Sequence, residues 1–153
     1  MRLWHYQLIP VLPRQQLLGQ WRECCAIAKV IATKKTINHP LVAKITSYPA
    51  YMFMGYQMRV KKEIEARGYS VNESAMFNLY DNTMLAEEQG YFADDDDFPF
   101  NAEELFPGWH NERYLRQCYF NLQEKYDCNL ISNEEWEKIE RFVDCTNVMM
   151  YYL

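Results

Sequence analysis

The amino-acid sequence predicts an all-α protein, folded as one compact domain over residues 1–153, with about four main helices and long connecting loops. A chain of 153 residues suits a single hydrophobic core and is too short for two. Apolar residues recur three or four positions apart along several stretches, which is the period of an amphipathic helix. No run alternates between polar and apolar residues for long enough to build a sheet.

The first elements in the chain are an extended or looped segment and a long helix. Residues 1–10 alternate in polarity and are expected to form a strand or loop. Pro13 suits the first turn of a helix, which we predict over residues 14–32. The apolar positions of this helix recur at helical spacing: Leu17, Leu18, Trp21, Cys24, Cys25, Ala28 and Ile31. A loop is expected from residue 33 through His39 and Pro40.

A second helix is predicted over residues 49–67. Ser47 lies just before it as a possible cap, and Gly68 suits the left-handed position that follows a helix. Its first half is almost wholly apolar or aromatic and its second half is charged. We therefore expect the first half to be buried at the centre of the protein and the second half to be exposed.

The third helical region, over residues 72–90, is expected to break around Asp81 and Asn82. Four consecutive carboxylates follow at positions 94–97, and their mutual repulsion favours a solvated loop. Calcium or magnesium binding there is not favoured, because the run lacks turn glycines and spaced ligands.

Two further helices are predicted from their caps. Asn111 precedes a helix that continues to about residue 126, and its side chain can accept a hydrogen bond from the first turn. Ser132 and Glu135 have the spacing of a capping box, which opens a last helix to about residue 144.

The net charge of −5 conceals a strong asymmetry between the two halves of the chain. Residues 1–68 contain 11 Lys and Arg against 3 Asp and Glu, a net +8, whereas residues 69–153 contain 5 against 18, a net −13. The basic half is able to neutralise nucleic-acid phosphates. An alternative is that the halves neutralise each other across an internal interface or in a dimer.

The remaining composition favours a soluble cytoplasmic protein without a metal site. The N-terminus lacks a signal-peptide pattern, and no apolar run is long enough to span a membrane. The five cysteines include an adjacent pair, and neither they nor the three scattered histidines have zinc-ligand spacing. We expect reduced, mostly buried thiols and neither metal nor cofactor.

Glu23 is the leading candidate for a catalytic group. It lies in the middle of the first predicted helix, and positions 19 and 27, one turn away on either side, are Gly19 and Ile27. An ordinary surface ion pair therefore does not explain it, and Gly19 leaves room for another group to approach the helix. The alternative, open at this point, is an exposed glutamate or one with a purely structural partner.

Residues 12–25 read Leu-Pro-Arg-Gln-Gln-Leu-Leu-Gly-Gln-Trp-Arg-Glu-Cys-Cys, and this segment resembles the opening helix of pyrimidine-dimer DNA glycosylases of the endonuclease V type. The start of the chain, Met-Arg-Leu-Trp-His, is similar to the bacterial members of that family. Weaker similarity covers Glu65 to Tyr69 and the segment from Tyr114 to Lys125. The resemblance is specific over about the first 25 residues.

The resemblance implies a DNA-repair glycosylase with associated AP-lyase activity, which acts on damaged or abasic duplex DNA without a cofactor. In this family a primary amine attacks the sugar carbon that holds the damaged base and forms a Schiff base. By position, Glu23 assists ring opening and proton transfer, while Arg22 binds phosphate or orients Glu23. The bulk of Arg2 is expected to prevent removal of Met1, so the Met1 amine is the predicted nucleophile, and a chain-terminal amine is partly neutral near pH 7.

The predicted DNA contacts come from the basic half of the chain. They are Arg2, His5, Arg14, Gln15, Lys29, Lys34 and Lys35, with Lys44 as a further basic candidate. Trp4, Tyr6 and Trp21 are candidates for stacking on an extruded base. The alternative function is a non-catalytic DNA- or protein-binding member of the same fold. The sequence does not determine the preferred lesion or the oligomeric state.

Overall fold

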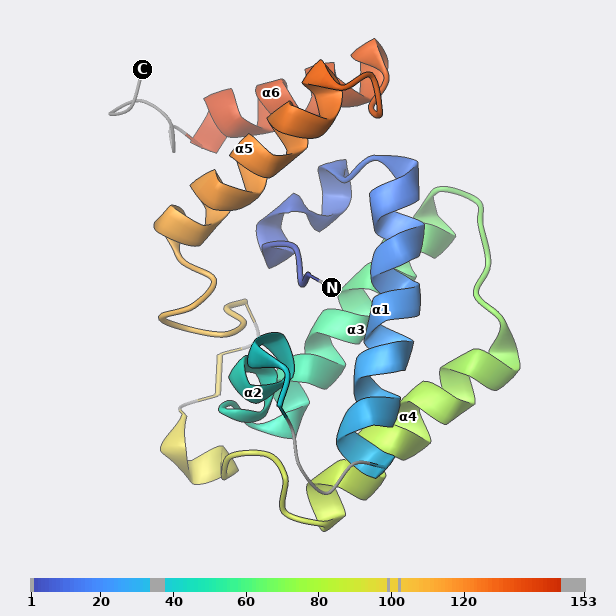
Figure 1. The fold of residues 1–153 in the computed structure, drawn as a ribbon, viewed down its shortest axis with the longest axis vertical. Coiled ribbons are helices and arrows are strands. Elements are labelled where there is room, and N and C mark those ends of the chain that lie inside the picture. The colour runs from blue at the N-terminus through green and yellow to red at the C-terminus, as the bar shows by residue number, and fades with distance from the viewer. Residues whose placement is uncertain (1, 34–37, 99, 102, 147–153) are drawn as a thin grey trace.

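The computed structural model describes residues 2–33, 38–98, 100–101 and 103–146 (Figure 1). Within these residues the protein is all-helical, as predicted, with six α-helices, two short 3-10 helices and no strand. The expected number of about four main helices was therefore too low. None of the helices described is long and apolar enough to cross a membrane.

The first long helix, α1 (Arg14–Thr33), matches its prediction closely, and α3 (Ala50–Ala66) does so within a residue at either end. Gly68 follows α3 with a φ of +86°, which is the left-handed conformation expected of it. Ser47 is not the cap of α3, because its backbone ends the preceding helix instead.

That preceding helix, α2 (Pro40–Thr46), occupies a stretch for which the sequence predicted no helix. Pro40 takes the first helical position, where its missing N–H costs nothing. The ring Nδ1 of His39 accepts a hydrogen bond from the Leu41 N–H at 3.2 Å. Histidine is an uncommon N-cap, so the sequence at this position predicts a loop rather than the start of a helix.

The third region is one unbroken helix, α4 (Glu73–Glu88), and the expected break at Asp81 and Asn82 was wrong. Tertiary contacts override the local preference there, since Thr83 is buried and its hydroxyl accepts a hydrogen bond from Gln57 Nε2 at 3.1 Å. The carboxylate run forms a short exposed 3-10 helix, η2 (Asp95–Asp97).

Both predicted caps near the C-terminus are confirmed. Asn111 Oδ1 accepts from the Tyr114 N–H at 3.0 Å at the start of α5 (Glu112–Asp127). Ser132 and Glu135 exchange the two hydrogen bonds of a capping box at the start of α6 (Asn133–Thr146).

The helices pack in two groups around the amino-terminal residues (Figure 1). α1 packs against α3 and α4, while α5 and α6 lie against each other at the opposite end of the molecule. Between the groups lies η1 (Tyr6–Val11), a 3-10 helix that contacts both α3 and α6. The expectation of a strand or loop for residues 1–10 is therefore corrected over Tyr6–Val11, because adjacent Leu8 and Ile9 are both buried and no alternation of faces remains.

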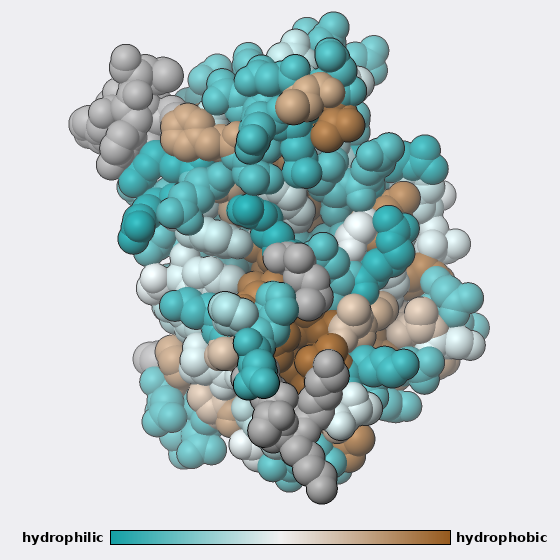
Figure 2. All heavy atoms as spheres, viewed as in Figure 1, coloured by the Kyte–Doolittle hydropathy of each residue, from teal (hydrophilic) through white to brown (hydrophobic). Residues whose placement is uncertain are grey.

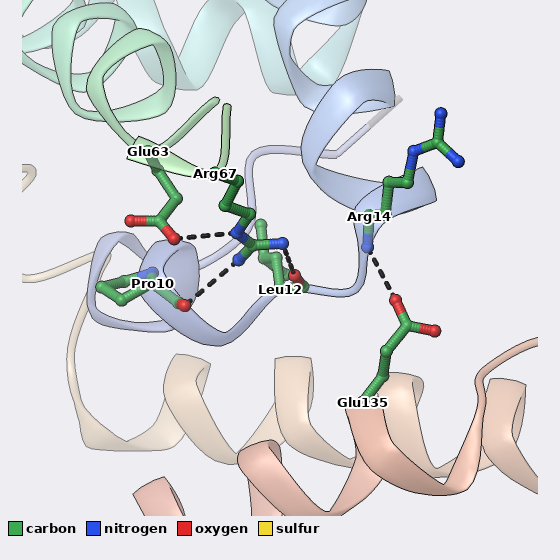
Figure 3. Close-up of polar contacts among 6 residues, drawn as sticks. All are labelled: Pro10, Leu12, Arg14, Glu63, Arg67 and Glu135. Carbon is green, nitrogen blue, oxygen red and sulfur yellow. Dashed lines mark hydrogen bonds and ion pairs between the residues drawn. The ribbon is translucent and has the colours of Figure 1, made fainter. Parts of the chain in front are cut away.

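Side-chain contacts to the backbone connect η1 and α1 to distant helices (Figure 3). The Arg67 guanidinium at the end of α3 donates to the carbonyls of Pro10 at 3.1 Å and Leu12 at 2.8 Å. Glu135 Oε2 on α6 accepts from the Arg14 N–H at 2.8 Å, in the first turn of α1. Burial alone would raise the pKa of Glu135, but the hydrogen bonds from Arg14 and Ser132 outweigh burial and lower it.

The surface differs between the two groups of helices. Figure 2 shows mainly hydrophilic residues over α5 and α6, whereas hydrophobic residues are visible nearer the centre of the same face.

All five cysteines are free thiols, but the expectation that they are mostly buried holds only in part, because Cys128 and Cys145 are exposed.

Candidate active site

Glu23 lies on a polar stripe of α1 that faces the first residues of the chain. Gln16, Gln20 and Glu23 are spaced four and three residues apart, and Gly19 precedes Gln20 directly, so the four residues share one side of the helix. Gln20 is 1% exposed and Glu23 is half-buried. This stripe contacts residues 2–4, which we call the N-terminal segment.

The backbone of the N-terminal segment is hydrogen-bonded to this stripe along its length. Glu23 Oε2 accepts from the Arg2 N–H at 2.9 Å. Gln20 Nε2 donates to the Arg2 carbonyl at 2.9 Å, and Gln20 Oε1 accepts from the Trp4 N–H at 2.8 Å. The segment thus runs along α1 much as a strand runs beside its neighbour, with side chains replacing the partner backbone.

Two tyrosines hold the remaining carbonyls of the N-terminal segment. Tyr56 on α3 donates to the Trp4 carbonyl at 2.7 Å, and Tyr114 on α5 donates to the Leu3 carbonyl at 2.6 Å. Burial raises the pKa of both phenols, so both keep their protons at neutral pH. Three different helices therefore fix one short stretch of backbone.

A hollow of about 440 Å³ opens beside Glu23, and we call it the Glu23 hollow. The N-terminal segment and α1 line one side of it, and α5 lines the other. Its residues are Arg2, Trp4, Gln15, Gln16, Gly19, Gln20, Glu23, Asn121 and Lys125. Gln16 Oε1 is buried without a hydrogen-bond partner among the described residues, so it can accept a hydrogen bond from a ligand or water.

A second, larger opening of about 590 Å³ adjoins the first, and we call it the Lys44 groove. It lies between α2 and α5 and is lined by Arg2, Pro40, Leu41, Lys44, Gly108, Trp109, Asn111, Arg113, Tyr114 and Gln117. Its charged residues are all cations, Arg2, Lys44 and Arg113, and none of them forms an ion pair with a described residue. Such a groove suits an anionic ligand.

Arg2 is common to both openings. Its guanidinium lies over the Trp4 ring, 5.1 Å from the ring centre, which restrains the side chain by a cation–π contact. Its backbone meanwhile is bonded to Glu23 and Gln20. Arg2 therefore contacts the Glu23 carboxylate in the Glu23 hollow and also contributes a cation to the wall of the Lys44 groove.

The other predicted site residues are dispersed. Gln15 lines the Glu23 hollow. Arg22 is exposed and lines a different, more apolar hollow, although a Cβ at Gly19 would lie 3.9 Å from its Nη2 atom. The guanidinium thus lies over Gly19, at the edge of the Glu23 hollow. Arg14 lies over the Tyr69 ring, and Lys29 is exposed further along α1.

His5 does not reach the Glu23 hollow. It is 2% exposed, stacks on His110 with ring centres 5.1 Å apart, and accepts from the Gln7 N–H through Nδ1. Burial lowers its pKa to about 4, so the ring is neutral at pH 7. The predicted sites Met1, Lys34 and Lys35 lie outside the described residues.

The sequence did not predict the contribution of α5. Arg113, Gln117, Asn121 and Lys125 are spaced four residues apart on this helix, and the first pair lines the Lys44 groove while the second lines the Glu23 hollow. That spacing was a detectable signal of a polar face. It falls in the half of the chain whose net charge is −13, so the overall charge does not indicate a DNA-binding face there.

A family model described as pyrimidine dimer DNA glycosylase matches residues 1–77, which is 77 of the 153 residues. The matched region contains the N-terminal segment, the polar stripe of α1 and Tyr56, but not α5. No curated protein and no solved structure matches the chain.

Proposed function

Because the chain belongs to the pyrimidine dimer DNA glycosylase family, we propose that it releases damaged bases from duplex DNA and cleaves the resulting abasic sites, with the Met1 amine as nucleophile and Glu23 as the proton-transfer group. The observation that carries this proposal is the 2.9 Å hydrogen bond between the Arg2 N–H and Glu23 Oε2. The residue before Arg2 is covalently joined to that nitrogen, so an amine at the start of the chain lies within a few ångströms of it.

The proposed reaction begins with attack of the neutral Met1 amine on C1′ of the damaged nucleotide. As the bond from C1′ to the base breaks, the Glu23 carboxylate accepts the proton that the amine loses, and the departing base takes up a proton from solvent. The sugar ring then opens to a Schiff base as its ring oxygen gains a proton, which Glu23 is placed to deliver. Glu23 Oε1 has no hydrogen bond among the described residues, which supports its availability for this transfer.

Binding of DNA is assigned to the cations around the two openings. Arg2, Lys44, Arg113 and Lys125 come from both halves of the chain, yet they line adjoining hollows. Phosphate neutralisation by such residues dominates the affinity of proteins for DNA. Trp109 is half-buried in the Lys44 groove and offers a ring for stacking.

Borohydride trapping on a duplex with one abasic site tests the proposal. The wild type is expected to form a covalent adduct, and Glu23→Gln is expected to form it far more slowly while binding the duplex normally. Glu137→Gln, which removes an exposed carboxylate from α6, serves as the matched control and is expected to trap like the wild type. Intact mass of the purified protein reports whether Met1 is retained.

The outcome also separates the proposed enzyme from a binding protein of the same fold. Salt-sensitive DNA binding without any trapped adduct would favour a non-catalytic DNA-binding member. Absence of DNA binding at low salt would favour a protein-binding role. Either result would contradict the catalytic assignment.

A further inference from the structure

We infer that Gln20 and Tyr56 are positioning residues that fix the register of residues 2–4 along α1 and thereby set the distance between the chain's amino end and Glu23. The inference rests on the proposed function, in which that amine and that carboxylate carry the reaction. Neither residue belongs to the predicted set of site residues.

Gln20 holds the N-terminal segment at two points. Its Nε2 donates to the Arg2 carbonyl at 2.9 Å, and its Oε1 accepts from the Trp4 N–H at 2.8 Å. Only one orientation of the carboxamide satisfies both contacts, because the flipped amide would face donor to donor and acceptor to acceptor. A slip of the segment by one residue would break both hydrogen bonds and leave the 1% exposed side chain unsatisfied.

Tyr56 fixes the same register from α3. Its hydroxyl lies 2.7 Å from the Trp4 carbonyl oxygen and 2.9 Å from Gln20 Oε1, and its one proton bonds either acceptor. The side chain is fully buried and lines neither opening. Any effect of its hydroxyl on the reaction must therefore pass through the N-terminal segment and Gln20, since DNA cannot touch it.

Register matters here because the reacting amine belongs to the residue next to the segment. One residue of slip moves the backbone by about 3.8 Å. A misplacement of about 1 Å costs roughly a hundredfold in rate. A chain end without contacts would not hold its amine to within about 1 Å. The hydrogen bonds of residues 2–4 therefore supply this positional precision.

Two variants test the inference by removing hydrogen bonds with little change of volume. In Tyr56→Phe and Gln20→Met, single-turnover trapping is expected to slow by about tenfold to a hundredfold. Affinity for an uncleavable duplex is expected to stay within about twofold of the wild type, because neither change alters the cations of the groove.

Tyr48→Phe is the matched control. The Tyr48 hydroxyl also donates to a backbone carbonyl, that of Pro107 at 2.7 Å, but it does not contact the N-terminal segment. It is expected to trap at the wild-type rate, although its thermal stability should fall as much as that of Tyr56→Phe. If both tyrosine variants slow trapping equally, or if neither does, the inference is wrong.

A glycine inserted between Met1 and Arg2 distinguishes a positioning role of Tyr56 from a role in stability alone. With the segment held in register, the insertion displaces the amine and is expected to slow trapping about a hundredfold. In Tyr56→Phe the segment is already loosened, so the same insertion should cost far less. Additive effects of the two changes would overturn the inference.

Hydrogen exchange of backbone amides distinguishes failure of this inference from failure of the proposed function. Tyr56→Phe is expected to accelerate exchange of the Arg2 and Trp4 amides at least tenfold, with no change in α6. If the wild type forms no trapped adduct, the proposed function is contradicted. Hydrogen exchange of the Arg2 and Trp4 amides still decides whether Tyr56 holds the N-terminal segment in place. Unchanged protection of the two amides would overturn the positioning role whatever the activity.

Discussion

The Glu23 hollow and the Lys44 groove adjoin each other and share Arg2, but they are built in different ways. Around the hollow, buried and half-buried side chains from α1, α3 and α5 hold the backbone of residues 2–4 with hydrogen bonds of 2.6–2.9 Å. The groove offers cations that have no ion-pair partner among the described residues.

Under the proposed function, this contrast assigns catalytic geometry and DNA affinity to separate sets of residues. The hydrogen bonds around the hollow, of which all but that to Glu23 join neutral groups, fix position and depend little on salt. Exposed cations attract phosphate over a distance but are screened as ionic strength rises. Changes to the hollow should therefore alter reaction rate, and changes to the groove should alter binding.

The largest effect is expected from Glu23→Gln. The amide keeps an oxygen for the Arg2 N–H but cannot transfer a proton, and positioned acid–base groups contribute about 10²- to 10⁴-fold in rate. Single-turnover release of a damaged base should slow by that factor, with the dissociation constant for the duplex unchanged. A loss of affinity that matches the loss of rate would break the separation between hollow and groove.

Arg2→Gln is expected to be next in size, and to affect both properties. The guanidinium lines both openings, so its loss should weaken duplex binding about tenfold and slow trapping about tenfold, since one strong charged contact is worth about 1.5–3 kcal/mol. Titration of the duplex and single-turnover trapping measure the two effects. An effect on only one of them would assign Arg2 to a single opening.

The double variant Lys44→Ala with Arg113→Ala is expected to change binding alone. Removal of two phosphate contacts should reduce the slope of log affinity against log salt by about 1.8. Affinity measured from 50 to 200 mM salt gives this slope, and trapping at saturating protein should stay at the wild-type rate. An unchanged slope would show that DNA does not follow the groove.

Capping residues and a glycine predicted the helix ends that are fixed by neighbouring residues in the sequence. Asn111, the Ser132 and Glu135 pair, and Gly68 each end or begin a helix where their side chains or backbone freedom indicated. The 3-10 helix at Tyr6–Val11 was not predicted, because it is stabilised by contacts with α3 and α6 rather than by its own pattern.

The parts of the candidate site that lie on one helix are visible in the sequence, and the parts that join distant segments are not. Glu23 and Gly19 lie one turn apart on α1, a spacing that the sequence shows directly. The Tyr114 hydroxyl bonds the Leu3 carbonyl across 111 positions of sequence, and Lys125 lines the same hollow as Glu23. No periodicity within one helix reveals such pairings, because they arise only when α5 packs beside the N-terminal segment.

The smallest effect is expected far from both openings, at Glu135. Its pKa is lowered in the folded protein, so the stability it contributes is present above its ordinary pKa, near 4.5, and is lost as pH falls through the lower folded value. Glu135→Gln should reduce the free energy of unfolding at pH 7 by less than about 1 kcal/mol and flatten its decline in acid.

Denaturant unfolding from pH 7 to pH 3 measures this effect, with Glu137→Gln as the control on the exposed side of α6. Trapping and DNA affinity should be unchanged in Glu135→Gln at pH 7. An acid profile identical to that of the wild type would show that the contact between Glu135 and the Arg14 N–H does not lower the carboxyl pKa.

Peptide mapping of the borohydride-trapped adduct is the most direct test of the central claim, that the amino end held beside Glu23 supplies the nucleophile. Lys125 supplies the one primary amine among the described residues that line the hollow, so adducts on Met1 and on Lys125 would yield different modified peptides. We expect the sugar adduct on the α-amine of Met1, in Lys125→Ala as in the wild type. An adduct on Lys125, or one that disappears in Lys125→Ala, would contradict it.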